Sequence, residues 1–257
     1  MVKLIGSRTA KKILTNVAGI RQLTMRKQEN LIHSVNWDYL IILDACRCDY
    51  FEEECKIHGE YQRVWSPASC TVDWLKNMFS SFYPYTFYSS TPFVNSKMPI
   101  KNYNGRKHFI KIIDLWDWGW SDELCTVPPS VVYESAREAE SKSIIWFMQP
   151  HLPAIGKTKL VPKWFKENFT RGQGGDIVII EQVMRGELSP ETVKEAYREN
   201  LKLVLKYVSK LINELEGTII ITSDHGEYLG EMGFWSHPPN INDPILRAVP
   251  YLRLTVK

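Results

Sequence analysis

Three short apolar runs constrain the fold of this 257-residue chain more than any other feature of its sequence. They span residues 39–43, 143–148 and 218–222, and polar residues follow each of them. Each run is too short for a typical helix and does not alternate between apolar and polar residues. Each therefore predicts a strand that is buried on both faces of a sheet. Weaker strand candidates are residues 85–88, 109–113 and 251–256.

Helical patterns lie between these runs, and the clearest covers residues 189–215. Ser189 is a favourable N-cap, Pro190 suits the first turn, and Glu191 places a negative charge at the positive end of the helix dipole. Gly217 follows at a position typical of a helix stop. Buried strands that alternate with helices predict an α/β fold: a three-layer sandwich with a largely parallel central sheet. We assign residues 37–257 to this domain.

Residues 1–36 form a separate, basic N-terminal arm with a helical pattern. Seven lysines and arginines face only Glu29 in its first thirty residues. Its apolar residues recur at helical spacing, so they would lie on one face of a helix. That face either packs on the domain or lies on an anionic membrane surface. The apolar residues are Ile13, Leu14, Val17, Ile20 and Leu23.

Composition narrows the class of protein. The formal net charge of +3 gives no strong attraction to nucleic acid, and no apolar stretch approaches the ~18 residues of a membrane span. Charges interrupt the N-terminal apolar residues, which argues against a secretory signal and predicts a cytoplasmic protein, peripheral to the membrane if the arm binds there. Five cysteines are an odd number for a disulfide framework. The spacing of Cys46, Cys48, Cys55 and His58 matches no common zinc finger, so ordinary thiols are expected.

Polar residues that follow the three strong strands indicate a metal site. Asp44 follows the first strand, His151 follows the second, and Asp224-His225 follows the third, with Gly226 next to allow a tight turn. Sites in open α/β sheets lie at the carboxyl ends of the strands, so these side chains are expected to converge. Carboxylate oxygens and imidazole nitrogens suit a divalent cation such as zinc or manganese.

The residues after the third strand resemble a known signature. Residues 223–231 read Ser-Asp-His-Gly-Glu-Tyr-Leu-Gly-Glu, which resembles the S-D-H-G-E-x-L-G-E signature of sulfatases and related phosphotransferases in the alkaline phosphatase superfamily. Residues 42–45, 148–153 and 235–238 resemble three further segments of that superfamily, in the same chain order. The resemblance runs from Asp38 to the C-terminus and does not cover the basic arm. It implies an alkaline phosphatase-like fold and metal-dependent chemistry on an ester.

The resemblance places the nucleophile at the start of a helix within residues 66–75. Thr71 aligns best, although Asp73 and Trp74 replace the Pro-Ser pair that follows the nucleophile in the superfamily. A threonine hydroxyl is a weak nucleophile, and a bound cation together with the positive end of a helix would activate it. Ser69, which also suits a helix N-cap, and Cys70 remain alternatives.

The resemblance also implies the ligands of the metal. One zinc or manganese ion would be held by Asp44, Asp224 and His225, with Thr71 as the reacting ligand. Ala45 stands where sulfatases often have a further acidic ligand. No convincing extra aspartate is found for a second ion, which is left open.

Three further residues are expected to act on the substrate. His151 lies in a segment that resembles one carrying a substrate-side histidine, and His237 lies in a segment that resembles the one with the late histidine after the signature. Either histidine would also suit a second metal. Arg47 follows Asp44 by three residues and is expected either to clamp a phosphate or to pair with Asp49 or Glu52. These groups would stabilise developing charge or assist the leaving group.

The predicted function is a metal-dependent phosphoester hydrolase or phosphotransferase that acts through a threonine nucleophile. A sulfatase on the same fold is the first alternative, but the C-x-P-x-R motif for formylglycine formation is absent, because Thr71-Val72-Asp73-Trp74 follows Cys70. The second alternative is a catalytically silent relative that binds a glycan or a protein partner. The resemblance favours a phosphate- or sulfate-ester substrate, such as a glycan or lipid-linked glycan. No feature indicates the oligomeric state.

Overall fold

The protein, seen in a computed structural model that describes residues 25–161 and 175–257, is built around a mixed β-sheet. Within these residues the sheet has seven strands in the order β2-β9-β6-β1-β5-β3-β4. Strands β6, β1, β5, β3 and β4 are parallel, and β9 runs antiparallel between β6 and β2. The bounds are β1 Tyr39–Leu43, β2 Glu60–Trp65, β3 Tyr83–Ser89, β4 Phe109–Asp114, β5 Ser143–Phe147, β6 Gly217–Ser223 and β9 Ala248–Val256.

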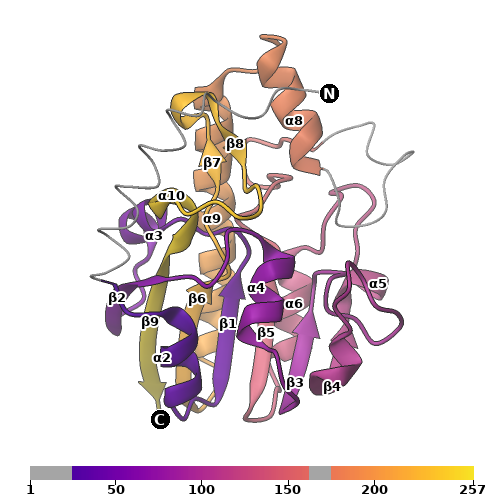
Figure 1. Cartoon of the computed structure of the whole chain (residues 1–257), viewed down its shortest axis with the longest axis vertical. Helices are drawn as coiled ribbons and strands as arrows, with labels where there is room; N and C mark the ends of the chain where they lie inside the picture. The colour runs from indigo at the N-terminus through magenta and orange to yellow at the C-terminus, as the bar shows by residue number, and fades with distance from the viewer. Residues whose placement is uncertain (1–24, 162–174) are drawn as a thin grey trace.

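Helices cover both faces of the sheet. Figure 1 shows α2 and α4 in front of it and α6 and α9 behind it. A small hairpin of β7 and β8 rises above the carboxyl ends of the parallel strands, close to α8. The remaining bounds are α2 Gln28–Ser34, α3 Cys48–Glu54, α4 Thr71–Met78, α5 Leu115–Trp118, α6 Pro129–Ala136, α8 Gly175–Met184, α9 Pro190–Ile212, α10 Pro244–Arg247, β7 Tyr228–Leu229, β8 Trp235–Ser236, and the 3₁₀ turns η1 Gly105–Lys107 and η2 Glu231–Gly233.

Strand β1 shows why the sheet is covered on both sides. Tyr39, Ile41 and Leu43 belong to the apolar core on the α9 side, whereas Leu40 and Ile42 belong to the core on the α4 side. All five side chains are buried. A continuous apolar run is what a strand between two layers of helices requires, because each side chain contributes ~1.5–3 kcal/mol of burial on one face or the other. The predicted three-layer α/β sandwich is confirmed.

The strong strands of the sequence are β1, β5 and β6, and the weaker candidates lie in β3, β4 and β9. Strand β2 was not predicted from the sequence, because its first four residues are polar or aromatic and lie exposed or half-buried at the edge of the sheet. The predicted cap of the long helix is confirmed: Ser189 Oγ accepts the N–H of Thr192 at 3.1 Å. Helix α9 ends at Ile212, a few residues before the predicted end, and a turn leads to β6.

Most of the predicted arm, including its apolar stripe at residues 13–23, lies outside the described residues. Helix α2, which falls within residues 1–36, packs against the domain. Leu31 and Ile32 are buried in the core on the α4 side, and Gln28 is fully buried. Within the described part of the chain, no helix has the length and apolar character needed to cross a membrane.

Candidate active site

Neighbouring parallel strands bring the two predicted aspartates together. Leu43 of β1 pairs in register with Ser223 of β6, so the next residues, Asp44 and Asp224, lie side by side at the carboxyl edge. The backbone N–H of Ala45 donates to Asp224 Oδ1 at 3.0 Å, which ties the two strand ends to each other. Both carboxylates are buried, with exposures of 3% and 0%.

Thr71 faces this pair of aspartates from helix α4. It is the first residue of α4, and its Oγ1 donates to Asp224 Oδ2 at 2.9 Å. The same oxygen lies 3.1 Å from His225 Nε2. The hydroxyl therefore lies at the positive end of a helix, against the Asp-His pair. The structure thus brings together all four predicted metal-site residues: Asp44, Thr71, Asp224 and His225.

The side-chain geometry at this point fits a cation. Potential ligand atoms of Asp44, Asp224 and His225 lie within 4.8 Å of one another. His225 Nδ1 lies 2.8 Å from the carbonyl oxygen of Gly226, which can only accept, so Nδ1 carries the proton. That tautomer directs the lone pair of Nε2 toward Asp224 Oδ2, 3.1 Å away. Two acceptors at this distance fit a shared positive charge, and this set of oxygen and nitrogen donors suits zinc or manganese.

The pKa values of the two carboxyls are shifted in opposite directions. Burial raises the pKa of Asp44 to about 6; the negative charge of Asp224 adds to the shift and the neighbouring imidazoles oppose it. Burial also disfavours the charged form of Asp224, but His225 and hydrogen bonds that include that of Thr71 lower its pKa overall. Trp146 Nε1 donates to Asp44 Oδ2 at 3.0 Å and fixes that carboxyl. A bound cation would favour the ionised form of both groups.

A second cluster lies directly beside the first. Glu227 is 1% exposed, and its carboxylate oxygens lie 3.2 Å and 3.3 Å from His237 Nδ1. His151 Nε2 lies 3.9 Å from Glu227 Oε2. Potential ligand atoms of these three residues lie within 4.8 Å of one another. The ring centroids of His225 and His237 are 4.3 Å apart, so the two clusters are in contact.

Glu227 is a site residue that the sequence did not reveal as such. It is the fifth residue of the Ser223–Glu231 signature, where it had no assigned role. His151 and His237, both predicted, converge with it from the segment after β5 and from the end of the β7–β8 hairpin.

Arg47 makes ion pairs rather than an open phosphate clamp. Its guanidinium donates to both oxygens of Asp49, at 3.0 Å and 2.6 Å, and also pairs with Glu231. It contacts the backbone carbonyl of Glu227 at 3.3 Å. The expected pairing with Asp49 is confirmed. The pairing with Glu52 is wrong, because Glu52 binds Arg63 on β2 instead.

The alternative nucleophiles lie close to Thr71 but face other groups. Ser69 Oγ donates to the carbonyl oxygen of Pro238 at 2.8 Å. Cys70 Sγ lies 3.4 Å from Asp73 Oδ2, and burial raises the pKa of the thiol to about 11. The expectation that Ser69 is the N-cap is wrong, because Cys70 holds that position and makes no side-chain capping bond.

Two further residues hold the signature strand in place. Gln28 Nε2 donates to Ser223 O and to Thr222 Oγ1, both at 2.7 Å, and Trp74 Nε1 donates to Gln28 Oε1 at 2.8 Å.

At Gly226, a Cβ atom would lie 1.9 Å from the carbonyl oxygen of Ile245. Glycine is therefore required here for close packing of two backbones.

The described residues contain no other group with metal-ligand geometry. Cys46, Cys48 and Cys55 do not form one with His58. Burial raises the pKa of Cys48 to about 12 and that of Cys46 well above its usual range, which is consistent with ordinary thiols.

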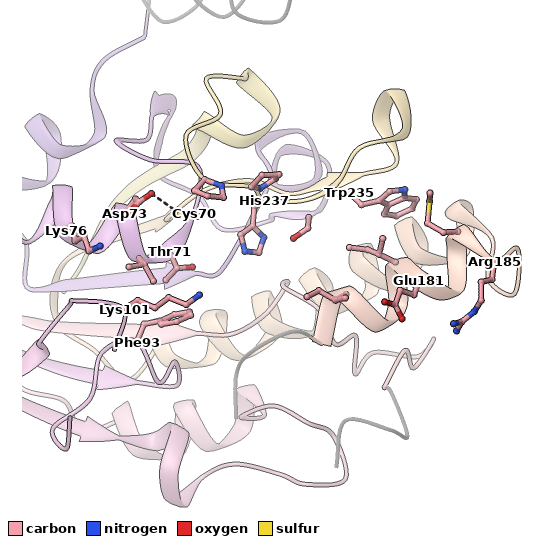
Figure 2. A pocket seen from close by; sticks show the side chains of 17 residues that line it. Cys70, Thr71, Asp73, Lys76, Phe93, Lys101, Glu181, Arg185, Trp235 and His237 are labelled. Atoms are coloured by element: carbon pink, nitrogen blue, oxygen red, sulfur yellow. Dashed lines mark hydrogen bonds between the residues drawn. The ribbon is translucent and has the colours of Figure 1, made fainter. Parts of the chain in front are cut away.

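Both clusters open toward one cavity. Thr71 and His237 line a cavity of about 830 Å³, and Figure 2 shows their side chains facing it from α4 and from the end of the β7–β8 hairpin. A cavity of this size that is lined by a side chain from each cluster is typical of a ligand site.

No family model matches this sequence, and neither does any curated protein sequence. Solved structures do match. The integral membrane protein lipooligosaccharide phosphoethanolamine transferase A from Neisseria meningitidis aligns with a TM-score of 0.57 at 15% identity, over 91% of this chain and 48% of that one. The chain thus spans about half the length of that transferase. The soluble domain of the same transferase gives 0.57 at 16% identity, over 85% of this chain and 76% of that domain.

The C-terminal periplasmic domain of EptC from Escherichia coli, in complex with Zn, gives a TM-score of 0.51 at 13% identity, over 91% of this chain and 76% of that domain. A periplasmic domain lends no support to the predicted cytoplasmic location. At these identities the similarity concerns the fold. The chain shares its fold with these transferase domains, and the predicted alkaline phosphatase-like fold is confirmed.

Proposed function

We propose that this chain is a metal-dependent phosphoester hydrolase or phosphotransferase with Thr71 as its nucleophile. The observation that carries the proposal is the position of Thr71 Oγ1, 2.9 Å from Asp224 Oδ2 and 3.1 Å from His225 Nε2 at the start of α4. The fold is that of phosphoethanolamine transferase domains, one of which was crystallised with Zn. Both facts support transfer of a phosphoryl-containing group.

The reaction begins at the threonine hydroxyl. Thr71 directs its proton at Asp224 Oδ2, so that oxygen is the acceptor when Oγ1 attacks phosphorus. The new bond joins Oγ1 to phosphorus, and the bond from phosphorus to the leaving alcohol oxygen breaks. The product is a phosphothreonine ester that passes its group to water or to an acceptor alcohol. A divalent cation held by Asp44, Asp224 and His225 would lower the pKa of the hydroxyl and neutralise negative charge on the phosphoryl oxygens.

The histidines of the second cluster serve the leaving group. His237 lies against Glu227, which holds its ring with Nδ1 toward the carboxylate. His151 Nδ1 donates to the carbonyl oxygen of Leu152 at 2.5 Å, which leaves its Nε2 toward the cluster. A protonated imidazole here donates to the departing oxygen, and a neutral one accepts a proton from the incoming water or alcohol. The His151, Glu227 and His237 set also has the donors for a second zinc or manganese ion.

Sulfate esters are the weaker alternative. A formylglycine would have to form at Cys70 or Ser69, and neither side chain faces the Asp224-His225 pair. Thr71, which does face it, is not a residue from which formylglycine is made.

A glycan or lipid-linked acceptor is a further part of the proposal. One structural neighbour is described as a lipooligosaccharide phosphoethanolamine transferase, and the basic arm would favour an anionic membrane surface. Sedimentation with anionic vesicles tests the arm. The full chain is expected to pellet at low salt, whereas a chain lacking residues 1–24, which retains α2, stays in solution.

Trapping the covalent ester tests the proposed function. The zinc- or manganese-loaded chain is mixed with phosphate mono- and diesters, quenched in acid, and analysed by intact and peptide mass spectrometry. One phosphoryl-containing group is expected on Thr71, and Thr71→Ala should lose at least ~10³-fold in turnover, while Ser69→Ala keeps most of it. Labelling of Ser69 or Cys70 would contradict the choice of nucleophile. A folded, metal-loaded chain with no turnover of any ester would favour the silent binding relative.

A further inference from the structure

The cavity above Thr71 has two chemically different ends. Figure 2 shows Thr71, Phe93 and Lys101 at one end, and Trp235 and α8 at the other. Lys101 Nζ lies 5.1 Å from the centre of the Phe93 ring, and both residues line the cavity together with Thr71. Lys76 lines the same cavity, and Asp73 is the one carboxylate labelled near it in Figure 2, so lysines outnumber carboxylates at this end. The end near Thr71 therefore carries positive charge suited to an anionic phosphoryl group.

The far end has an apolar surface supplied by α8, beside the charged Glu181 and Arg185 of the same helix, which also line the cavity (Figure 2). Ile177, Ile180 and Met184 lie on one face of this helix, at the i, i+3 and i+7 positions, and all three line the cavity. Another face of the same helix already packs into the core, with Ile179 buried and Val183 partly buried. The helix thus has more apolar surface than its packing on the domain requires.

Ile180 packs partly against the core, whereas the other two residues of this face have little cover among the described residues. Ile177 is 50% exposed and Met184 is 64% exposed, although both are large apolar side chains. Trp235 lies at the same end as α8 (Figure 2), is 5% exposed and adds an aromatic ring to the lining. A concave surface of this composition gains free energy by removing an aliphatic group from water.

We propose that the cavity binds an aliphatic chain carried by the phosphoester, so that the substrate is an amphiphile. Its anionic phosphoryl group lies at Thr71 and Lys101, and its chain extends along Ile177, Ile180 and Met184 toward Trp235. This inference rests on the proposed chemistry at Thr71 for the position of the phosphoryl group. The cavity volume of about 830 Å³ falls in the range of cavities that enclose whole small molecules, so several methylene groups can be accommodated.

Two homologous series test the proposal. The metal-loaded full chain is titrated calorimetrically with ethyl, butyl, hexyl and octyl phosphate, each kept below its micellar concentration. Turnover is measured with nitrophenyl phosphodiesters that carry the same four alkyl groups. The affinity and kcat/KM are expected to rise by about two- to fourfold per methylene group, the upper value corresponding to full burial of each. Flat series in the parent chain would overturn the proposal.

Variants at exposed positions locate the effect. The double variant Ile177→Ser/Met184→Ser should reduce the octyl-to-ethyl ratio by about tenfold or more, and it should fold because both side chains are at least half exposed. The matched control is Ile110→Ser on β4, which is 66% exposed and does not line the cavity. An equal reduction in the control would contradict the assignment to α8.

The two readouts separate this inference from the proposed function. Binding that strengthens with chain length without any turnover would contradict the proposed function and support the apolar site. Thr71-dependent turnover with flat series would contradict the apolar site alone. Absence of both would contradict both.

Discussion

The two side-chain clusters at the carboxyl edge of the sheet differ in how they are built. Asp44 and Asp224 directly follow two central, hydrogen-bonded strands, and Thr71 begins a helix that packs on those strands. His151 and His237, by contrast, come from a loop and from the end of a two-residue strand of the hairpin. Exposure follows the same division. The first cluster is buried throughout, whereas the side chains of His151 and His237 are 15% and 19% exposed.

This difference predicts separate roles for the two clusters. Burial and strand register hold the first cluster in one geometry, which suits metal binding and alignment of a nucleophile. The side chains of His151 and His237 in the second cluster are partly exposed, so these imidazoles can exchange protons with solvent. Loss of the first cluster should therefore abolish the reaction, while loss of the second should slow it and alter its dependence on the leaving group.

The largest effect is expected for Asp224→Asn. This change keeps the size of the side chain but removes the charge that binds the cation and accepts the Thr71 proton, so metal should be lost and turnover should fall by at least ~10³-fold. Elemental analysis and steady-state kinetics measure both. Glu227→Gln, the matched loss of one buried carboxylate in the other cluster, should keep one equivalent of metal. Equal metal content in the parent and in Asp224→Asn would contradict the metal site.

A smaller effect is expected for His237→Ala. Removal of a general acid should cost ~10²-fold or more on an ester with an alkyl alcohol as leaving group, and much less with nitrophenolate, which needs no proton. The exposed His58, changed to Ala, is the control and should behave as the parent. If both leaving groups lose turnover to the same extent, the imidazole has a role other than proton donation.

A pH effect on stability should be specific to the first cluster. Burial raises the pKa of Asp44 to about 6 in the folded, metal-free chain, above its ordinary value of 3.8, so the folded state holds a proton that the unfolded state has released. Metal-free stability should therefore fall as pH rises between these two values. Stabilisation by zinc, measured as the shift in Tm, should be larger at pH 7.5 than at pH 5 because the cation no longer competes with that proton.

Asp44→Asn supplies the control for this effect. It removes the titrating group, so the metal-free variant should lose much of the fall in Tm across the same pH window. An unchanged pH profile in the variant would assign the titration to another residue.

The smallest effect on activity is expected for Gln28→Ala. Its side chain joins α2 to the end of β6 and to Trp74, so the loss of these buried bonds should lower the free energy of unfolding by about 1–3 kcal/mol. Turnover should change by less than ~10-fold, because the metal ligands remain. Urea unfolding and kinetics on the same sample test this, and a loss of activity as large as that of Thr71→Ala would show that Gln28 does more than support the strand.

The sequence predicted correctly those elements whose structure depends on residues close to one another in the chain. The run at residues 39–43 predicted a doubly buried strand, and Ser189 predicted the start of α9, because burial pattern and capping depend on near neighbours in sequence. The resemblance of the sequence motifs to the superfamily then implied a site of Asp44, Thr71, Asp224 and His225, and the structure brings these residues together.

The contacts that were missed depend on long-range packing. Gln28 reaches Ser223 across 195 positions of sequence, and no pattern within α2 reveals that its amide faces inward. Glu227 joins His151 only because the loop after β5 folds over the signature segment. Arg47 had two candidate acids nearby in sequence, yet one of its partners, Glu231, lies on η2. Loop paths of this kind are set by the assembled domain and are not encoded in any short window.

The close approach at Gly226 divides the letters of the signature into two kinds. Asp224, His225 and Glu227 supply the side chains of the proposed site, whereas Gly226 is required because the backbone of Ile245 leaves no room for a side chain. Relatives without the proposed activity could replace Asp224, His225 and Glu227 but would still need the glycine to fold. A relative that retains only the glycine would therefore reveal shared ancestry without shared activity, and one that retains the acids but loses the glycine should be rare.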